Sequence, residues 1–264
     1  MALIRGEGIV LKTHALGDTS RIAVVYMRDQ GLVKLVAKGA RKTPSRFGFS
    51  LEPLSRARFT YYFKPDRDLH LLSQAETLDP VGSRIKELSR LAHAQAALEL
   101  IDRLVWGMEP HPELFDLLQA TVDAATRAPE ASLPAVTLAF QLQVASLMGY
   151  RPRLDACAGC GGALSPRRVF SPERGGLLCD ACAASDAGGI VLSADALAGL
   201  SLLLRHPVLD AGTYLEVRRA GEILRVVEAF LRCHFQRFRG LRSLEVLRSL
   251  PGGTKSPKEA PCPV

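Results

Sequence analysis

Four cysteines in two C-x2-C pairs are the residues of this sequence with the clearest chemistry. Cys157 and Cys160 form the first pair, Cys179 and Cys182 form the second, and 18 residues lie between the pairs. This spacing is typical of four thiolates that share one tetrahedral metal ion. Zinc is the expected ion, and an iron–sulfur cluster or loose disulfides are the alternatives. Four thiolates leave zinc no position for a water or a substrate, so we expect one structural zinc ion per chain.

The residues between and around the cysteines favour a zinc ribbon. Gly159, Gly161 and Gly162 permit the tight backbone that lets amides approach the thiolates. The segment from Arg168 to Leu178 can form a hairpin that turns at residues 173–176. The other cysteines and the histidines show no ligand spacing, so we expect core, surface or tail positions for Cys233, Cys262, His93, His111, His206 and His234.

A basic segment near the N-terminus is the second feature with a chemical meaning. It contains no acid from residue 31 to residue 50, and its cations are Lys34, Lys38, Arg41, Lys42 and Arg46. Lys34 and Lys38 emerge on one face of a strand. Such cations can neutralise phosphates, and neighbouring aromatic rings can stack on bases. The alternative is a solvated loop in which Phe47 and Phe49 pack on the core; Arg21, Arg56 and Arg58 could extend the basic surface.

A second basic stretch lies near the C-terminus. Its first part is interleaved with acids, which is typical of an ordinary helix face with ion pairs. Arg237, Arg239 and Arg242 lie beyond these acids. We therefore regard these three arginines as candidates for a contact with a partner protein or with DNA.

The first eighty residues must position the basic segment, and they are expected to be strands. Apolar and β-branched runs occur at residues 5–13, 20–27, 32–38, 57–64 and 69–77, with turn residues between them. Five short strands without a helix favour a small closed barrel such as the OB-fold, because closure removes exposed strand edges. An SH3-like barrel or an open sheet also fits this pattern.

Helical periodicity replaces the strand pattern near Asp79-Pro80. Apolar residues three and four apart predict helices over residues 83–105, 112–126, 134–148, 194–204 and 214–238, with Ser193 as an N-cap. We expect an α+β multidomain chain: an OB-fold at 1–80, a helical domain at 81–150 and 189–250, a zinc ribbon inserted at 151–188, and a disordered tail at 251–264.

Composition excludes some classes of protein and leaves others open. The chain has 264 residues, 47% of them hydrophobic, and a net charge of +7, which is a mild indication of a nucleic-acid partner. No apolar run is long enough for a signal peptide or a membrane span, so we expect a cytoplasmic protein. With DNA as its partner, it is expected to be nucleoid-associated. Phosphate-binding loops, dinucleotide fingerprints, zinc-protease motifs and nucleophile elbows are lacking, so we do not expect an enzyme.

Four stretches of the sequence resemble the RecO family of bacterial recombination mediators. The first is Gly8-Ile-Val-Leu-Lys-Thr13 with Gly17-Asp-Thr-Ser20, and the second is residues 31–42 with Pro44-Ser-Arg-Phe47. The third is Gly149-Tyr-Arg-Pro152 leading into the cysteine pairs and Gly175-Gly-Leu-Leu-Cys179. The last is His234 with Leu241-Arg-Ser243. The resemblance covers most of residues 5–250, and the second and third stretches together are fairly specific.

The resemblance implies a fold and a function. It implies an N-terminal OB-fold, a helical domain and an inserted zinc ribbon. It also implies binding of single- and double-stranded DNA, annealing of complementary strands, and partnership with RecR and single-stranded DNA-binding protein in loading RecA. The helical domain is then expected to receive the acidic, hydrophobic tail of single-stranded DNA-binding protein. Two other hypotheses remain open: a zinc-ribbon protein–protein adaptor without DNA binding, and an unrecognised nuclease or hydrolase.

Overall fold

A computed structural model of the chain describes residues 2–42, 47–214 and 217–250. The chain divides into two compact units, residues 1–122 and residues 123–264, which are described one after the other. No helix among the described residues is long and apolar enough to cross a membrane. The tail expected to be disordered lies outside these residues.

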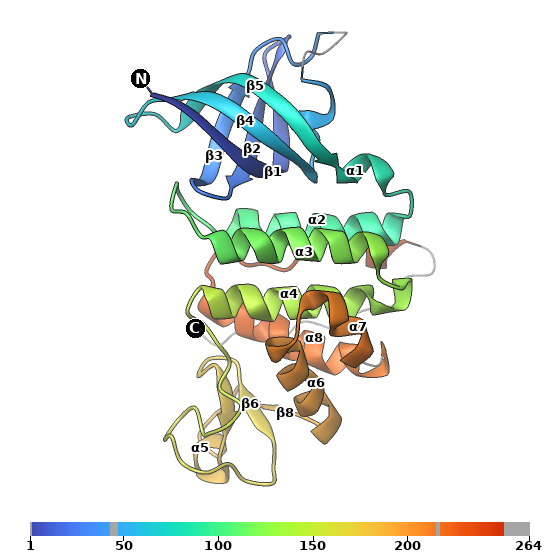
Figure 1. Cartoon of the computed structure of the whole chain (residues 1–264). Helices are drawn as coiled ribbons and strands as arrows, with labels where there is room; N and C mark the ends of the chain where they lie inside the picture. Colours follow the sequence, from blue (N-terminus) through green and yellow to red (C-terminus); the bar gives the residue numbers. More distant parts are fainter. Residues whose placement is uncertain (1, 43–46, 215–216, 251–264) are drawn as a thin grey trace. The chain divides into compact units, whose positions relative to one another are not determined.

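The first unit contains a closed five-stranded barrel (Figure 1). The strands follow the order β1-β2-β3-β5-β4, and β1 pairs with β4 to close the ring. Neighbouring strands are antiparallel except β3 and β5, which are parallel. This closed ring confirms the expected fold class. The bounds are β1 Ala2–Leu16, β2 Ser20–Met27, β3 Gly31–Ala37, β4 Ser55–Phe63 and β5 Leu69–Pro80.

The alternation of side chains along the strands explains the barrel. In β4, Ala57, Phe59 and Tyr61 are fully buried, whereas the residues between them face outward and are only partly buried. The buried set fills the interior together with side chains from the other strands, among them Val25, Leu35 and Leu72. A one-residue shift in register would turn this set to the solvent, so the pattern determines the pairing.

Ion pairs connect helical segments of the first unit to the barrel, and the following two join residues far apart in the sequence. The short helix α1 (Val81–Arg84), the helix α2 (Leu88–Leu104) and the beginning of α3 (Pro112–Arg127) follow β5. Lys12 Nζ on β1 lies 2.6 Å from Asp102 Oδ2 on α2. The guanidinium of Arg28 donates to both carboxylate oxygens of Asp116 on α3, at 2.5 and 2.9 Å.

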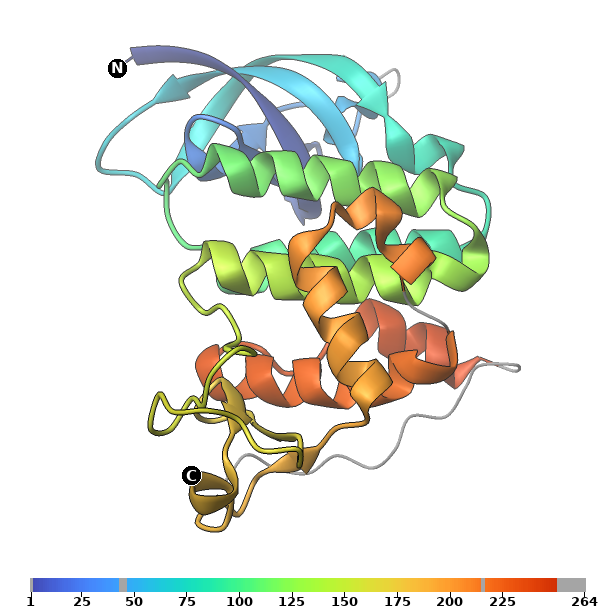
Figure 2. The ribbon, with the colours of Figure 1, turned by 60° about the horizontal axis from the view of Figure 1, so that its bottom comes forward.

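The second unit is built around α4 (Leu133–Leu147), which is buried on nearly all sides. The helices α6 (Ala194–Arg205), α7 (Ala211–Tyr214) and α8 (Val217–His234) pack against it, as Figures 1 and 2 show. Ser193 caps α6 as expected, because its Oγ accepts a hydrogen bond from the Ala196 amide at 3.1 Å. The last helix, α9, spans Arg242–Ser249.

The long helix predicted to end at Phe238 is shorter than expected. α8 ends at His234, and a turn follows in which the Phe238 amide donates to the Phe235 carbonyl at 2.9 Å. Phe235 and Phe238 are nonetheless buried. Phe235 and Phe238 are three residues apart, a spacing that occurs both on one face of a helix and in this turn. The apolar pattern therefore did not indicate where the helix ends.

The ribbon is a small sheet inserted between α4 and α6. Its strands β6 (Val169–Ser171), β7 (Gly176–Leu178) and β8 (Ile190–Val191) have the order β7-β6-β8, and the short helix α5 (Asp180–Ala183) follows β7. β6 and β7 form the expected hairpin, with Phe170 opposite Leu177. Gly175 has a φ of +67°, a conformation that favours glycine in the turn.

Candidate metal centre and nucleic-acid interface

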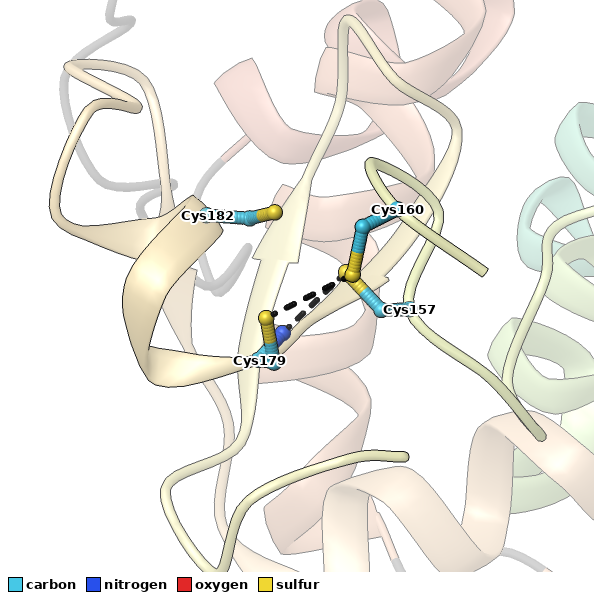
Figure 3. A group of neighbouring side chains, drawn as sticks. All are labelled: Cys157, Cys160, Cys179 and Cys182. Carbon is cyan, nitrogen blue, oxygen red and sulfur yellow. Dashed lines mark hydrogen bonds between the residues drawn. The ribbon is translucent and has the colours of Figure 1, made fainter. Parts of the chain in front are cut away.

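The four cysteines meet at one point of the ribbon (Figure 3). Cys157 and Cys160 lie on a turn, Cys179 follows β7, and Cys182 lies on α5. Their four Sγ atoms lie within 4.8 Å of one another. The Sγ atoms of Cys160 and Cys179 are 3.8 Å apart, which equals the edge of a sulfur tetrahedron around zinc, about 3.8 Å for a zinc–sulfur bond of about 2.3 Å. The sequence spacing therefore predicted this cluster correctly.

Backbone hydrogen bonds shape the first cysteine turn. The Gly161 amide donates to the Cys157 carbonyl at 2.8 Å, and the Cys157 amide donates to the Gly162 carbonyl at 2.9 Å. Gly161 has a φ of +75°. A Cβ on Gly159 would come within 3.0 Å of Cys182 Sγ, so a side chain there would crowd the sulfurs. The glycines serve the cluster in the way that the sequence indicated.

The electrostatics of the cluster favour a bound cation. The Cys179 backbone amide donates a hydrogen bond to Cys157 Sγ at 3.3 Å, and this bond is the main cause that lowers the pKa of the Cys157 thiol to about 6. Hydrogen bonds with the other thiols, that of Cys179 first, raise the pKa of Cys182 to about 12. One thiolate forms easily and four together repel one another, so the donor set fits a divalent metal ion that offsets this repulsion.

The cations of the basic segment fall into two groups on the barrel. Lys34 on β3 and Lys38 and Lys42 in the turn after it are exposed, and no carboxylate among the described residues forms an ion pair with them. Arg21 forms an ion pair with Glu52 at 2.8 Å, and Arg56 forms one with Glu7 at 3.5 Å. These three lysines are therefore open to an external anion.

The remaining residues of the basic segment are placed as follows. Nη1 of Arg41 donates to the Gly17 carbonyl at 2.7 Å, which directs its side chain along the loop before β2. Arg46 lies outside the described residues. Phe47 packs in the barrel core and is 3% exposed, whereas Phe49 is 60% exposed. Only Phe49 of these two rings therefore faces solvent.

Two family models together match most of the chain. The family model described as Recombination protein O N terminal matches residues 1–81, and the model described as Recombination protein O C terminal matches residues 85–245. The chain belongs to the RecO family. It is thus a protein of DNA repair and recombination.

The similarity to individual RecO proteins extends over nearly the whole chain. A DNA repair protein RecO of Streptomyces griseus is 36% identical over 250 residues, which are 92% of this chain and 98% of the relative. A DNA repair protein RecO of Thermobifida fusca is 34% identical over 249 residues, 94% and 99% of the two chains. A DNA repair protein RecO of Rubrobacter xylanophilus is 40% identical over 183 residues, 69% and 72% of the two chains.

The helical unit of this RecO chain carries an arginine groove that the sequence did not indicate. The groove has a volume of about 250 Å³. Arg151 and Arg153 at the start of the ribbon segment and Arg205 at the end of α6 line it, together with Pro152, Leu154, Leu204 and one acid, Asp155. These three arginines are exposed and form no ion pair among the described residues. More than fifty residues separate Arg153 from Arg205, so only folding brings them together.

The C-terminal arginines lie in and after the turn that follows α8. Arg237, Arg239 and Arg242 are exposed, and Nη1 of Arg239 donates to the carbonyl of Phe238 at 3.2 Å. Arg242 begins α9. Their role in partner binding stays a prediction.

Proposed function

We propose that this RecO chain is a non-enzymatic recombination mediator that binds single- and double-stranded DNA and anneals complementary strands. The observation that carries the proposal is the exposed set of Lys34, Lys38 and Lys42 on a barrel of a DNA repair family. Lysines that neutralise phosphates release condensed counterions, which drives binding without reading sequence. Arg41 is exposed and lies in the same turn, and Arg46, Arg21 and Arg56 stay predicted DNA contacts.

Annealing follows from charge neutralisation. Two complementary strands repel each other through their phosphates, and a basic protein surface lowers this repulsion while the bases pair. No bond is formed or broken by the protein. We assign the cysteine cluster to one structural zinc ion, because four thiolates complete the coordination of zinc. In this assignment Cys157, Cys160, Cys179 and Cys182 hold the ribbon together and take no part in chemistry on DNA.

We further propose that the chain acts with RecR and with single-stranded DNA-binding protein and thereby helps to load RecA. The acidic, apolar tail of single-stranded DNA-binding protein suits the arginine groove. Guanidinium groups bind carboxylates in bidentate fashion, and Pro152, Leu154 and Leu204 offer apolar contact. Arg237, Arg239 and Arg242 are the second candidate surface. A labelled tail peptide should lose affinity when Arg151, Arg153 and Arg205 are replaced by Ala, and the matched triple replacement of Arg237, Arg239 and Arg242 decides between the surfaces.

The decisive experiment is annealing of complementary oligonucleotides coated with single-stranded DNA-binding protein. We expect the chain to accelerate annealing, and Lys34→Ala, Lys38→Ala and Lys42→Ala combined should remove most of the acceleration. A protein–protein adaptor without DNA binding would neither anneal bare strands nor retain them on a filter at low salt. A nuclease would shorten labelled DNA during prolonged incubation with magnesium or manganese, and we expect the DNA to stay intact.

A further inference from the structure

A row of apolar side chains crosses the outside of the barrel. Leu3 on β1 lies opposite Tyr62 on β4, Tyr62 lies opposite Leu71 on β5, and Leu71 lies opposite Val36 on β3. These residues alternate with core residues such as Tyr61, Leu72 and Leu35, so they point outward. We call Leu3, Tyr62, Leu71 and Val36 the outer row. The solvent face of an antiparallel sheet is ordinarily polar, so an apolar row across four strands indicates a binding surface.

The outer row is partly accessible, and cations border it. Leu3 is 61% exposed and Leu71 is 38% exposed, whereas Tyr62 and Val36 are partly buried. Tyr62 and Leu71 line a hollow of about 510 Å³ together with Lys38 and Lys42 at the end of β3. Lys34 pairs across β3 and β5 with Leu69, which is 41% exposed. An aromatic ring, aliphatic side chains and unpaired ammonium groups therefore share one stretch of the wall.

The chemistry of this surface fits unpaired nucleotides. A base offers an apolar face to a tyrosine ring or an aliphatic side chain, and its phosphate offers negative charge to a lysine. In a duplex the faces of the bases are stacked inside the helix and cannot reach the row. An apolar protein partner would not need three lysines without acidic partners at the rim, whereas a polyanion does. Charge complementarity therefore favours a single strand as the occupant.

We propose that the outer row is the platform for the bases of a bound single strand. Tyr62 stacks on one base, Leu71 and Val36 contact its neighbour, and Lys38 and Lys42 hold the adjoining phosphates. This inference rests on the proposed DNA binding and adds to it a preference for strands that carry exposed bases. In this proposal Tyr62 supplies the ring that stacks on a base, and neither Phe49 nor a residue of the basic segment does so.

The test compares an oligothymidylate with an abasic oligonucleotide of the same length and number of phosphates. At one fixed salt concentration, the chain should bind the intact strand about tenfold more tightly than the abasic strand. Tyr62→Ala should weaken binding of the intact strand until the two affinities are equal, because the abasic strand has no base to stack on the ring. Tyr62→Phe should keep the ratio because it keeps the ring, and Phe49→Ala should keep it because Phe49 lies outside the row.

The outcomes separate this inference from the proposed function. Binding of both strands with equal affinity would overturn the base platform, leave electrostatic DNA binding standing, and assign the row to an apolar protein partner. Binding of neither strand would overturn DNA binding itself. Loss of the ratio in Phe49→Ala, with the ratio kept in Tyr62→Ala, would move the platform to Phe49 and overturn the assignment.

A second measurement does not depend on the stability of a variant. Ultraviolet cross-linking of the wild-type chain to an oligonucleotide that contains 5-iodouracil, followed by mass spectrometry, should label the peptide that contains Tyr62. Cross-links found only on peptides outside β1, β3, β4 and β5 would overturn the proposal.

Discussion

Nε2 of His234, the last residue of α8, lies 2.9 Å from the carbonyl oxygen of Pro172 in the hairpin of the ribbon. In the neutral ring a protonated Nε2 donates this hydrogen bond. The imidazole also packs on Phe230 at 4.6 Å and on Tyr150 at 5.3 Å between ring centroids. The hairpin of the ribbon is therefore attached to α8 by a hydrogen bond at its turn, and Phe170 on β6 adds a ring contact with Phe230 at 6.2 Å.

Replacement of His234 should loosen the ribbon without removing its metal ion. His234→Ala deletes the bond to Pro172 and part of an aromatic cluster, and we expect the free energy of unfolding to fall by about 1–2 kcal/mol. Hydrogen exchange at residues 169–178 should become faster. His234→Gln keeps a side-chain donor, so its free energy of unfolding and its exchange rate should lie between those of the wild type and those of His234→Ala. Exchange at the wild-type rate in His234→Ala would show that the bond does not hold the hairpin.

The barrel should lose stability in mild acid because of His70. This side chain is 2% exposed, and its Nδ1 accepts a hydrogen bond from the Lys64 amide at 3.4 Å, which only the unprotonated nitrogen can do. Burial lowers the pKa of His70. The unfolded chain, in which the histidine pKa is about 6.5, then binds the proton more readily, so stability is complete above this pH and declines as the pH falls below it.

The variant His70→Gln isolates this effect from the titration of carboxylates. We expect the difference in free energy of unfolding between the wild type and His70→Gln to shrink between pH 7 and pH 5, measured by urea denaturation at each pH. A difference that stays constant over this range would mean that the ring is protonated equally in the folded and unfolded chain.

The spacing of residues along the sequence was sufficient to predict the features of this chain that depend on residues close together in the sequence. The C-x2-C pairs, the hairpin between them and the five strands follow from turn residues and periodicity, and they are present as expected. Features that depend on residues far apart in the sequence could not be predicted from local spacing. Arg205 joins Arg151 only through packing of α6, and the carboxylates of Glu52 and Glu7 pair with Arg21 and Arg56 only once the barrel has closed.

The outer row illustrates the same limit within the barrel. Leu3, Tyr62, Leu71 and Val36 lie on four strands, and each is unremarkable in its own segment. Their common position depends on the register of three strand pairs, one of them parallel, and periodicity within a strand carries no information about register between strands. The basic segment was visible in the sequence, whereas the apolar surface beside it was not.

Elemental analysis should find about one zinc ion per chain. Cys157→Ser leaves three thiolates, which bind zinc more weakly, and a ribbon with few core residues of its own depends on the metal for its folding. We therefore expect loss of zinc and faster proteolysis within residues 151–188. Cys233→Ser is the matched control, because Cys233 lies outside the cluster, and it should keep the full zinc content. Zinc retained in Cys157→Ser, or lost in Cys233→Ser, would contradict the assignment.

The dependence of single-strand binding on salt should identify the cations that touch DNA. Each phosphate contact contributes about 0.7 to the slope of log affinity against log salt, so replacing Lys34, Lys38 and Lys42 together by Ala should reduce the slope by about 2. The matched control replaces three arginines that already hold carboxylates, Arg21, Arg56 and Arg58. Both triple variants lower the net charge from +7 to +4, because each removes three positive charges.

The two variants therefore differ in contacts and not in net charge. If long-range attraction alone drives binding, they will weaken it equally and leave the slopes alike. If the exposed lysines contact phosphates, the lysine variant alone will show the reduced slope, and the arginine variant will stay near the wild type. A larger reduction in the arginine variant would place the DNA on the face of Arg21 and Arg56, and the lysines would lose the role assigned to them.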